Sequence, residues 1–234
     1  LGSIAAILIV GAAVLWPAVN MQRARAVQSS NQANMAASGL AFGAYAMDHE
    51  DRLPMVSRPD PAEQWVWWRV GTDPDSSNSA NLYALHRFGY ARQASLNSPG
   101  NPNAPAELLP PGALDWRSFD EVSYSYTLSA DAPGTFSPAM TLVLADRSPV
   151  TMRAHRGQPV FLNENSMNHR GRGQHVLMGD GGVGWLTSPV TATGDHIYLP
   201  RPIERLVRSV RDGQRITFEE MVAPGGRADA FVGP

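Results

Sequence analysis

The sequence predicts an α+β protein in which one long N-terminal helix packs on an antiparallel β-sheet. Three observations predict this fold. Residues 1–48 carry helical patterning without a stop signal, first almost wholly apolar and then amphipathic. Several later segments are short alternating or continuous apolar runs, which are typical of strands. Asp180-Gly181 separates two such runs and is a strong hairpin signal, because both residue types tolerate the positive φ of a tight turn.

The chain divides into a helical stalk, a head and a tail. Residues 1–19 are the predicted transmembrane and assembly half of the helix, and residues 20–50 are its amphipathic half. Residues 51–222 are predicted to form a globular α+β head, with a variable loop region at about 58–121. The remaining segment, 223–234, has little apolar content and is predicted to be a flexible tail.

Bulk composition narrows the function classes. The chain of 234 residues has a formal net charge of −2, which argues against a general nucleic-acid binder because such proteins carry a basic patch or stripe. Cysteine is absent, so disulfides are excluded. The head alone is long enough to bury a sizeable core.

The first half of the helix predicts a membrane anchor. Leu1–Val19 contains no charged residue, and at about 1.5 Å per residue it spans roughly 28 Å, close to the hydrocarbon thickness of a bilayer. A cleaved signal peptide fits less well, because the apolar run is longer than a secretory core and no basic residue precedes it. The residues predicted to form the anchoring and assembly surface are Ile4, Ile7, Leu8, Val10, Val14, Leu15 and Pro17.

The second half of the helix is predicted to present a small-residue stripe to the sheet or to another helix. The stripe follows 4-3-4-3 spacing, with Met35, Phe42 and Tyr45 beside it. Its members are Ala33, Ala37, Leu40, Ala44 and Met47. The helix should end near Asp48–Asp51, because Leu53-Pro54 favours extended backbone.

The head predicts a sheet with short helices. The expected strands are Trp65–Val70, Val122–Leu128, Thr141–Ala145, Val160–Leu162, His175–Gly179, Val183–Leu186 and Arg215–Phe218. The expected short helices are Asn81–Tyr90 and Pro202–Val210. In the first strand, Trp65 and Trp67 share one face. Core packing is the favoured interpretation of these tryptophans, and an aromatic platform that stacks sugars is the alternative.

The stalk resembles the type IV pilin-like proteins of planctomycete-type bacteria, a prepilin-type family with an N-terminal cleavage and methylation signal that is related to type II secretion pseudopilins. The resemblance rests on Asn34-Met35, Gly39–Phe42, Tyr45–Asp48, Leu53-Pro54 and the helix-kinking Pro17. In that family the kinking proline lies further from the mature N-terminus. The resemblance therefore implies that this sequence begins just inside the mature protein, with the leader and cleavage site upstream.

The C-terminal half carries the second part of the resemblance. His169 precedes Asp180-Gly181 by ten intervening residues, similar to the His…Asp-Gly signature of the same family. The resemblance implies a non-enzymatic structural subunit of a pilus-like or pseudopilus-like assembly. Its helix would associate with copies of itself or with other pilin-like subunits, in the inner membrane, with the head in the periplasm or outside the cell. No nucleic-acid partner is expected.

Candidate metal ligands are the acidic residues and histidines of the C-terminal half. Asp146, His169 and Asp180 are the principal candidates, with His175, Asp195 and His196 within possible reach. Such a set suits a divalent metal, and the calcium sites of some pseudopilins make calcium a possibility through the resemblance. The spacings match no metal motif, so turn and hydrogen-bonding roles are the favoured interpretation. No cofactor is predicted.

Catalytic motifs are missing from the sequence, which contains no Gly-x-Ser-x-Gly, no P-loop and no dinucleotide fingerprint. No catalytic residue is predicted. Two alternatives to the structural subunit remain. One is a membrane-anchored surface module that binds glycan or peptide through Trp65–Trp68 or the glycine-rich loop. The other is an anchored hydrolase that uses His169 and Asp180.

Overall fold

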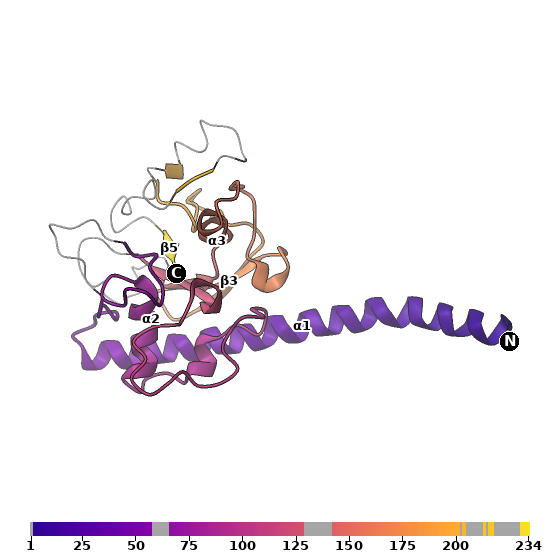
Figure 1. Cartoon of the computed structure of the whole chain (residues 1–234), viewed down its shortest axis with the longest axis horizontal. Coiled ribbons are helices and arrows are strands. Elements are labelled where there is room, and N and C mark those ends of the chain that lie inside the picture. Colours follow the sequence, from indigo (N-terminus) through magenta and orange to yellow (C-terminus); the bar gives the residue numbers. More distant parts are fainter. Residues whose placement is uncertain are drawn as a thin grey trace.

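The computed structural model describes residues 2–57, 66–128, 142–201, 203–204, 213, 215–217 and 230–234, with side chains in the first helix described at 13 and from 15 onward. Helix α1 (Gly2–Asp48) lies against a five-stranded antiparallel sheet, which confirms the predicted α+β class (Figure 1). The side chains of Ile4, Ile7, Leu8, Val10 and Val14 lie outside the described residues. So do Trp65 and most of the predicted helix Pro202–Val210. The predicted strand Arg215–Phe218 is wrong for residues 215–217, which are described and irregular, and its last residue lies outside the described residues.

Helix α1 is continuous over 47 residues and contains Pro17. At about 1.5 Å per residue it is roughly 70 Å long. Its C-terminal half lies along the head, and its N-terminal half projects beyond it (Figure 1). The helix ends as predicted, and Glu50 and Asp51 follow with φ values of 56° and 58°.

Of the two partners predicted for the small-residue stripe of α1, the sheet is excluded. The buried side of α1 carries Asn31, Met35, Ser38, Phe42 and Tyr45, again at 4-3-4-3 spacing. The predicted stripe lies on the opposite side, where Leu40 is 79% and Met47 is 85% exposed. The aromatic side has more apolar area to bury, and the ring of Phe42 stacks on Tyr126 with centroids 5.5 Å apart.

The sheet has the order β4-β3-β2-β1-β5, and each neighbouring pair is antiparallel. Its strands are β1 (Tyr124–Thr127), β2 (Leu144–Asp146), β3 (Gln174–Leu177), β4 (Val183–Leu186) and β5 (Val232–Gly233). Alternate residues face opposite sides. Tyr124 and Tyr126 join the core cluster under α1, whereas Val176 and Ala145 join a second cluster on the other face.

The predicted flexible tail is wrong for residues 230–234. Strand β5 pairs with β1, and Phe231 and Val232 are buried. The amide of Val232 donates to the carbonyl of Ile197 at 2.9 Å, and Phe231 packs edge-on against Trp67. An apolar Ala-Phe-Val sequence at an open sheet edge gains more from burial than the composition of the whole tail indicates.

The helices of the head are α2 (Asn78–Arg87) and α3 (Pro149–His155), with short 3₁₀ turns η1 (Gln93–Leu96), η2 (Phe119–Glu121) and η3 (Met167–His169). Helix α2 overlaps the predicted Asn81–Tyr90, and α3 was not predicted. Its start is signalled by Ser148, whose hydroxyl accepts from the amide of Thr151, and by Pro149.

Two further predicted strands are not strands. Trp67 and Trp68 lie in a turn closed by the amide of Arg69 on the carbonyl of Val66, and Trp67 is only 3% exposed. Its ring belongs to the core, which does not favour a sugar platform. Val160–Leu162 is irregular, although Val160 is buried. Both segments were predicted as strands from their apolar content. Their buried side chains enter the core from irregular backbone instead.

No helix in the described part of the chain is long and apolar enough to cross a membrane. This finding contradicts the predicted single-pass location in the inner membrane.

Candidate functional site

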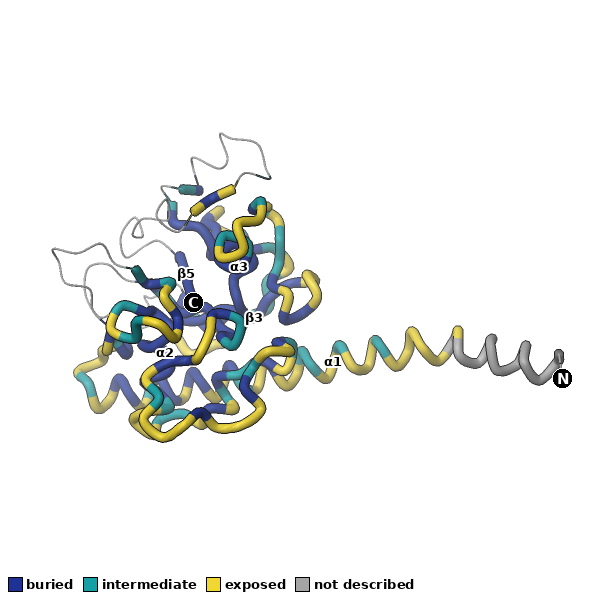
Figure 2. The backbone as a smooth tube through the Cα atoms, in the orientation of Figure 1, coloured by how far each residue is buried: buried dark blue, intermediate teal, exposed yellow. Residues whose placement is uncertain are grey.

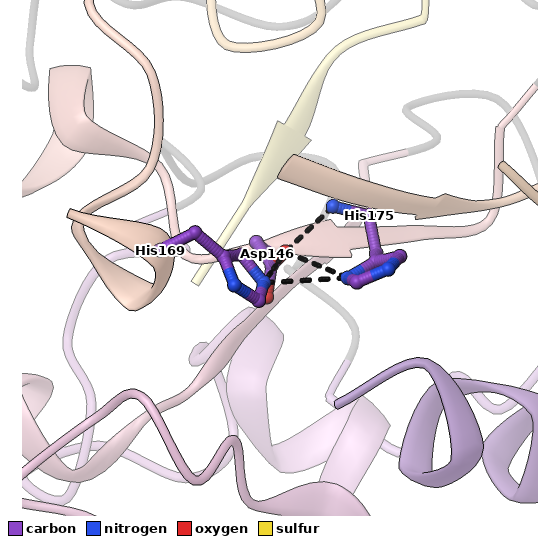
Figure 3. Close-up of side chains that lie close together, drawn as sticks. All are labelled: Asp146, His169 and His175. Carbon is purple, nitrogen blue, oxygen red and sulfur yellow. Dashed lines mark hydrogen bonds and ion pairs between the residues drawn. The ribbon is translucent and has the colours of Figure 1, made fainter. Parts of the chain in front are cut away.

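Three buried ligand-type side chains meet between the sheet and α1. They are Asp146 at the end of β2, His169 at the end of η3, and His175 in β3 (Figure 3). Asp146 Oδ2 is 3.0 Å from His169 Nε2 and 3.7 Å from His175 Nδ1. The two ring nitrogens are 3.3 Å apart. We call these three residues the Asp–His–His centre.

Asn31 of α1 closes the fourth side of the centre. Its Nδ2 lies 2.9 Å from Asp146 Oδ1 and 3.1 Å from both His169 Nε2 and His175 Nδ1. The hydroxyl of Tyr124 donates to Asn31 Oδ1 at 2.9 Å. The centre therefore joins the helix to strands β1, β2 and β3.

The local sequence explains how His169 reaches the centre. Ser166 begins η3, and its hydroxyl accepts from the amide of Asn168. Arg170 and Gly171 then adopt left-handed backbone, with φ values of 56° and 73°. Gly173 follows at φ 154°, where a Cβ would lie 2.5 Å from the carbonyl oxygen of Leu186. The glycines thus let the chain reverse within a few residues and enter β3.

Asp146 is held by donors from several segments. The backbone amide of His175 donates to its Oδ2 at 2.6 Å, and Asn168 Nδ2 donates to its Oδ1 at 2.9 Å. One proton arrangement satisfies the centre without a metal. His169 Nε2–H donates to Asp146, and the two amide protons of Asn31 go to Asp146 and to His175 Nδ1.

The electrostatics of the centre favour a neutral His175. Burial lowers the pKa of this imidazole, the nearby Asp146 carboxylate opposes the shift, and His169 adds to it. Burial raises the pKa of the Tyr124 hydroxyl well above its usual value, and Asp146 adds to that shift. Both groups are therefore uncharged near neutral pH, and His175 Nδ1 is free to accept a hydrogen bond or to bind a metal.

We expect the stability of the metal-free protein to fall as the pH drops below about 6.5. Because the pKa of His175 is lowered on folding, the unfolded chain binds the proton more readily, and acid shifts the equilibrium toward it. Urea unfolding in EDTA from about pH 8 to 5 checks this. The variant His175→Asn has no titrating group at this position, so its unfolding free energy should depend less on pH. The control His155→Asn replaces an exposed histidine and should keep the pH dependence of the wild type. If the unfolding free energy of His175→Asn changed with pH as steeply as that of the wild type, His175 would not be the group responsible.

The other predicted ligands lie elsewhere. Asp180 sits in the confirmed hairpin turn between β3 and β4, exposed, with its Oδ1 accepting from the amide of Gly182 at 2.8 Å. Asp195 pairs with Arg201 at 3.0 Å, and His196 Nε2 contacts the carbonyl oxygen of Leu162 at 2.9 Å. The structure therefore unites Asp146 and His169 and leaves out Asp180.

Asn31 was not predicted as part of any site. The signal that could have identified it is its register with Met35, Ser38 and Phe42, because a polar residue on the core face of a helix needs a buried partner. His175 stood only among the secondary candidates. The hairpin register pairs His175 with Trp185 of β4, and this pairing places His175 beside His169.

A cavity of about 180 Å³ borders the centre. Trp185 and His169 line it, and the Trp185 ring stands edge-on to both histidine rings at centroid distances of 5.0 and 4.8 Å. Exposed Arg23, Arg170 and Arg172 line its rim. Water and small ions can therefore reach His169 from this side.

The exposed side of α1 is a second candidate site. We call it the outer face, and it comprises Leu15, Ala18, Ala26, Ala33, Ala37, Leu40, Ala44 and Met47. At 3.6 residues per turn these residues share one side, and all are exposed. Figure 2 shows exposed positions recurring along α1. The helix carries no charge from residue 26 to 47. Solvent-facing helix surfaces normally carry charged side chains, so this surface has the composition of an interface.

No protein-family model, curated protein or solved structure matches this sequence.

Proposed function

We propose that the protein is a non-enzymatic structural subunit of a type IV pilus-like or type II secretion pseudopilus-like assembly, in which α1 helices of neighbouring copies pack along their outer faces. The observation that carries the proposal is the exposed, uncharged and mostly apolar outer face of a helix whose opposite face is already buried in the head.

The side chains of the outer face favour packing by a second helix. Leu40 and Met47 are mostly exposed, and burying each fully would contribute about 1.5–3 kcal/mol. The alanines between them let two helix backbones approach closely. Ala33, Ala37, Leu40, Ala44 and Met47 repeat every 3.5 residues on average, the spacing that keeps a seam facing its partner helix.

The shape of the molecule supports the same partner. The N-terminal half of α1 projects beyond the head, so a neighbouring helix meets no steric obstacle there (Figure 1). Leu15 and Trp16 on this half are 64% and 68% exposed. The outer face continues from the projecting half into the half that supports the head, so one copy can contact neighbours along most of its helix.

The experiment is sedimentation of the purified full chain over a wide concentration range. We expect the weight-average mass to rise with concentration, with species larger than a monomer at micromolar concentrations. Nonspecific hydrophobic aggregation would be irreversible on dilution, whereas packing of outer faces should reverse. A chain that stays monomeric at every concentration would contradict the proposal.

A further inference from the structure

We propose that Asp146, His169 and His175 bind one Zn²⁺ ion, with the side-chain amide of Asn31 at the fourth position, and that this ion fastens helix α1 to the sheet. The inference is independent of the assembly proposal, because it concerns the buried face of α1 and not the outer face.

The spacing of the four atoms carries the proposal. His169 Nε2, His175 Nδ1 and Asp146 Oδ2 are separated by 3.0, 3.3 and 3.7 Å, and Asn31 Nδ2 lies 3.1 Å from each ring nitrogen. A tetrahedral zinc ion with bonds of about 2.0–2.1 Å separates its ligand atoms by roughly 3.3–3.4 Å. Each of these five separations is within about 0.4 Å of that tetrahedral edge.

The ligand types select zinc over calcium. Two imidazole nitrogens and one carboxylate suit zinc and its first-row neighbours, whereas calcium takes six to eight oxygen ligands. The side chains proposed as ligands supply oxygens from Asp146 and Asn31, fewer than calcium takes. The ion that we propose is therefore zinc, and not the calcium that the family resemblance raised as a possibility.

The ligands are held in place before any metal arrives. Asp146 accepts from the His175 amide and from Asn168, and its side chain is fully buried. Both histidine side chains are at most 4% exposed, and both rings pack on the edge of Trp185. The carboxylate's hydrogen bonds and the packed rings provide the outer support that orients metal ligands.

Asn31 completes the site by turning its amide. A half-turn of the amide places Oδ1 toward the histidines and Nδ2 toward Tyr124. The Tyr124 hydroxyl then accepts from Nδ2 and donates to the carbonyl of Asn97, which lies 3.5 Å away. Binding of Zn²⁺ would also displace the proton between His169 Nε2 and Asp146, so that a lone pair of each group is available to the ion.

The test is metal binding by the full chain, freed of any affinity tag, stripped with EDTA and titrated with Zn²⁺, Co²⁺ or Ca²⁺. We expect one Zn²⁺ per chain, the intense visible bands of four-coordinate Co²⁺, a higher melting temperature with Zn²⁺, and none of these with Ca²⁺. His175→Ala should weaken zinc binding by more than about 100-fold, and Asn31→Ala by about 10–100-fold. His155→Ala, which removes an exposed histidine, should bind as the wild type does.

Three results would overturn the proposal. The first is wild-type protein that shows neither a zinc-induced rise in melting temperature nor the four-coordinate cobalt bands. The second is a His169→Ala/His175→Ala double variant that binds zinc as tightly as the wild type. The third is loss of zinc binding in His155→Ala. The wild-type measurements decide the question even if a ligand variant does not fold, because they require no substitution in the centre.

Discussion

Leu40→Arg is expected to weaken self-association at least about 100-fold, because it places a charge in the middle of the outer face. The change should leave the monomer folded, since Leu40 is 79% exposed and arginine forms helix nearly as well as leucine. Sedimentation measures the association, and circular dichroism with thermal unfolding checks the monomer.

The matched control is Leu108→Arg. Leu108 is also largely exposed, at 75%, but it lies in a loop of the head and not on α1. It receives the same change in charge and size, and it should associate like the wild type. Equal loss in both variants would show that net charge alone governs association, and it would contradict the role of the outer face.

Asp146→Ala is expected to destabilise the head by about 3–5 kcal/mol, as measured by urea unfolding. The carboxylate receives buried hydrogen bonds from the His175 amide, Asn31 and Asn168, and removing it leaves these donors without an acceptor. Because Asn31 belongs to α1, the helix should loosen from the sheet together with the His169 loop.

Asp180→Ala is the control for this change. It removes a carboxylate from the same C-terminal region, but Asp180 is exposed and caps only a turn amide, so the loss should stay below about 1 kcal/mol. Comparable losses in the two variants would contradict the assignment of Asp146 as the residue on which the buried network depends.

The long helix and the hairpin could be predicted because local signals specify them. Residues 1–48 carry helical patterning up to Leu53-Pro54, and Asp180-Gly181 defines the turn between β3 and β4. The orientation of the helix could not be predicted in the same way. Two sides of α1 share 4-3-4-3 spacing, one through Leu40 and one through Phe42, and spacing alone does not say which side meets the sheet.

The Asp–His–His centre could be predicted only in part for a related reason. Its three members are Asp146, His169 and His175. The pairing of β2 with β3 brings Asp146 and His175 together, and η3 adds His169. That register is a tertiary property that spans more than twenty residues of chain. Asp180 shared the residue type of a ligand but belongs to the turn, at the far end of β3 from His175.

The two sites lie on opposite sides of the same helix. Asn31 ties the inner side of α1 to the sheet, and Ala33 and Ala37 lie on the outer face nearby. A centre that fixes the rotation of α1 against the head also fixes the direction in which the outer face points. We therefore expect subunits to pack with their heads in a defined orientation around the helices.

Disulfide trapping tests the central claim most directly, because the chain contains no cysteine. Single cysteines at Ala33, Ala37 or Ala44 would lie on the outer face, and a cysteine at the exposed neighbour Gln32 would lie about 100° away around the helix. Under mild oxidation the three outer-face variants should form disulfide-linked dimers of the full chain, while Gln32→Cys stays at background. Dimers at Gln32 as abundant as those at the outer face, or none at any outer-face position, would contradict helix packing through this surface.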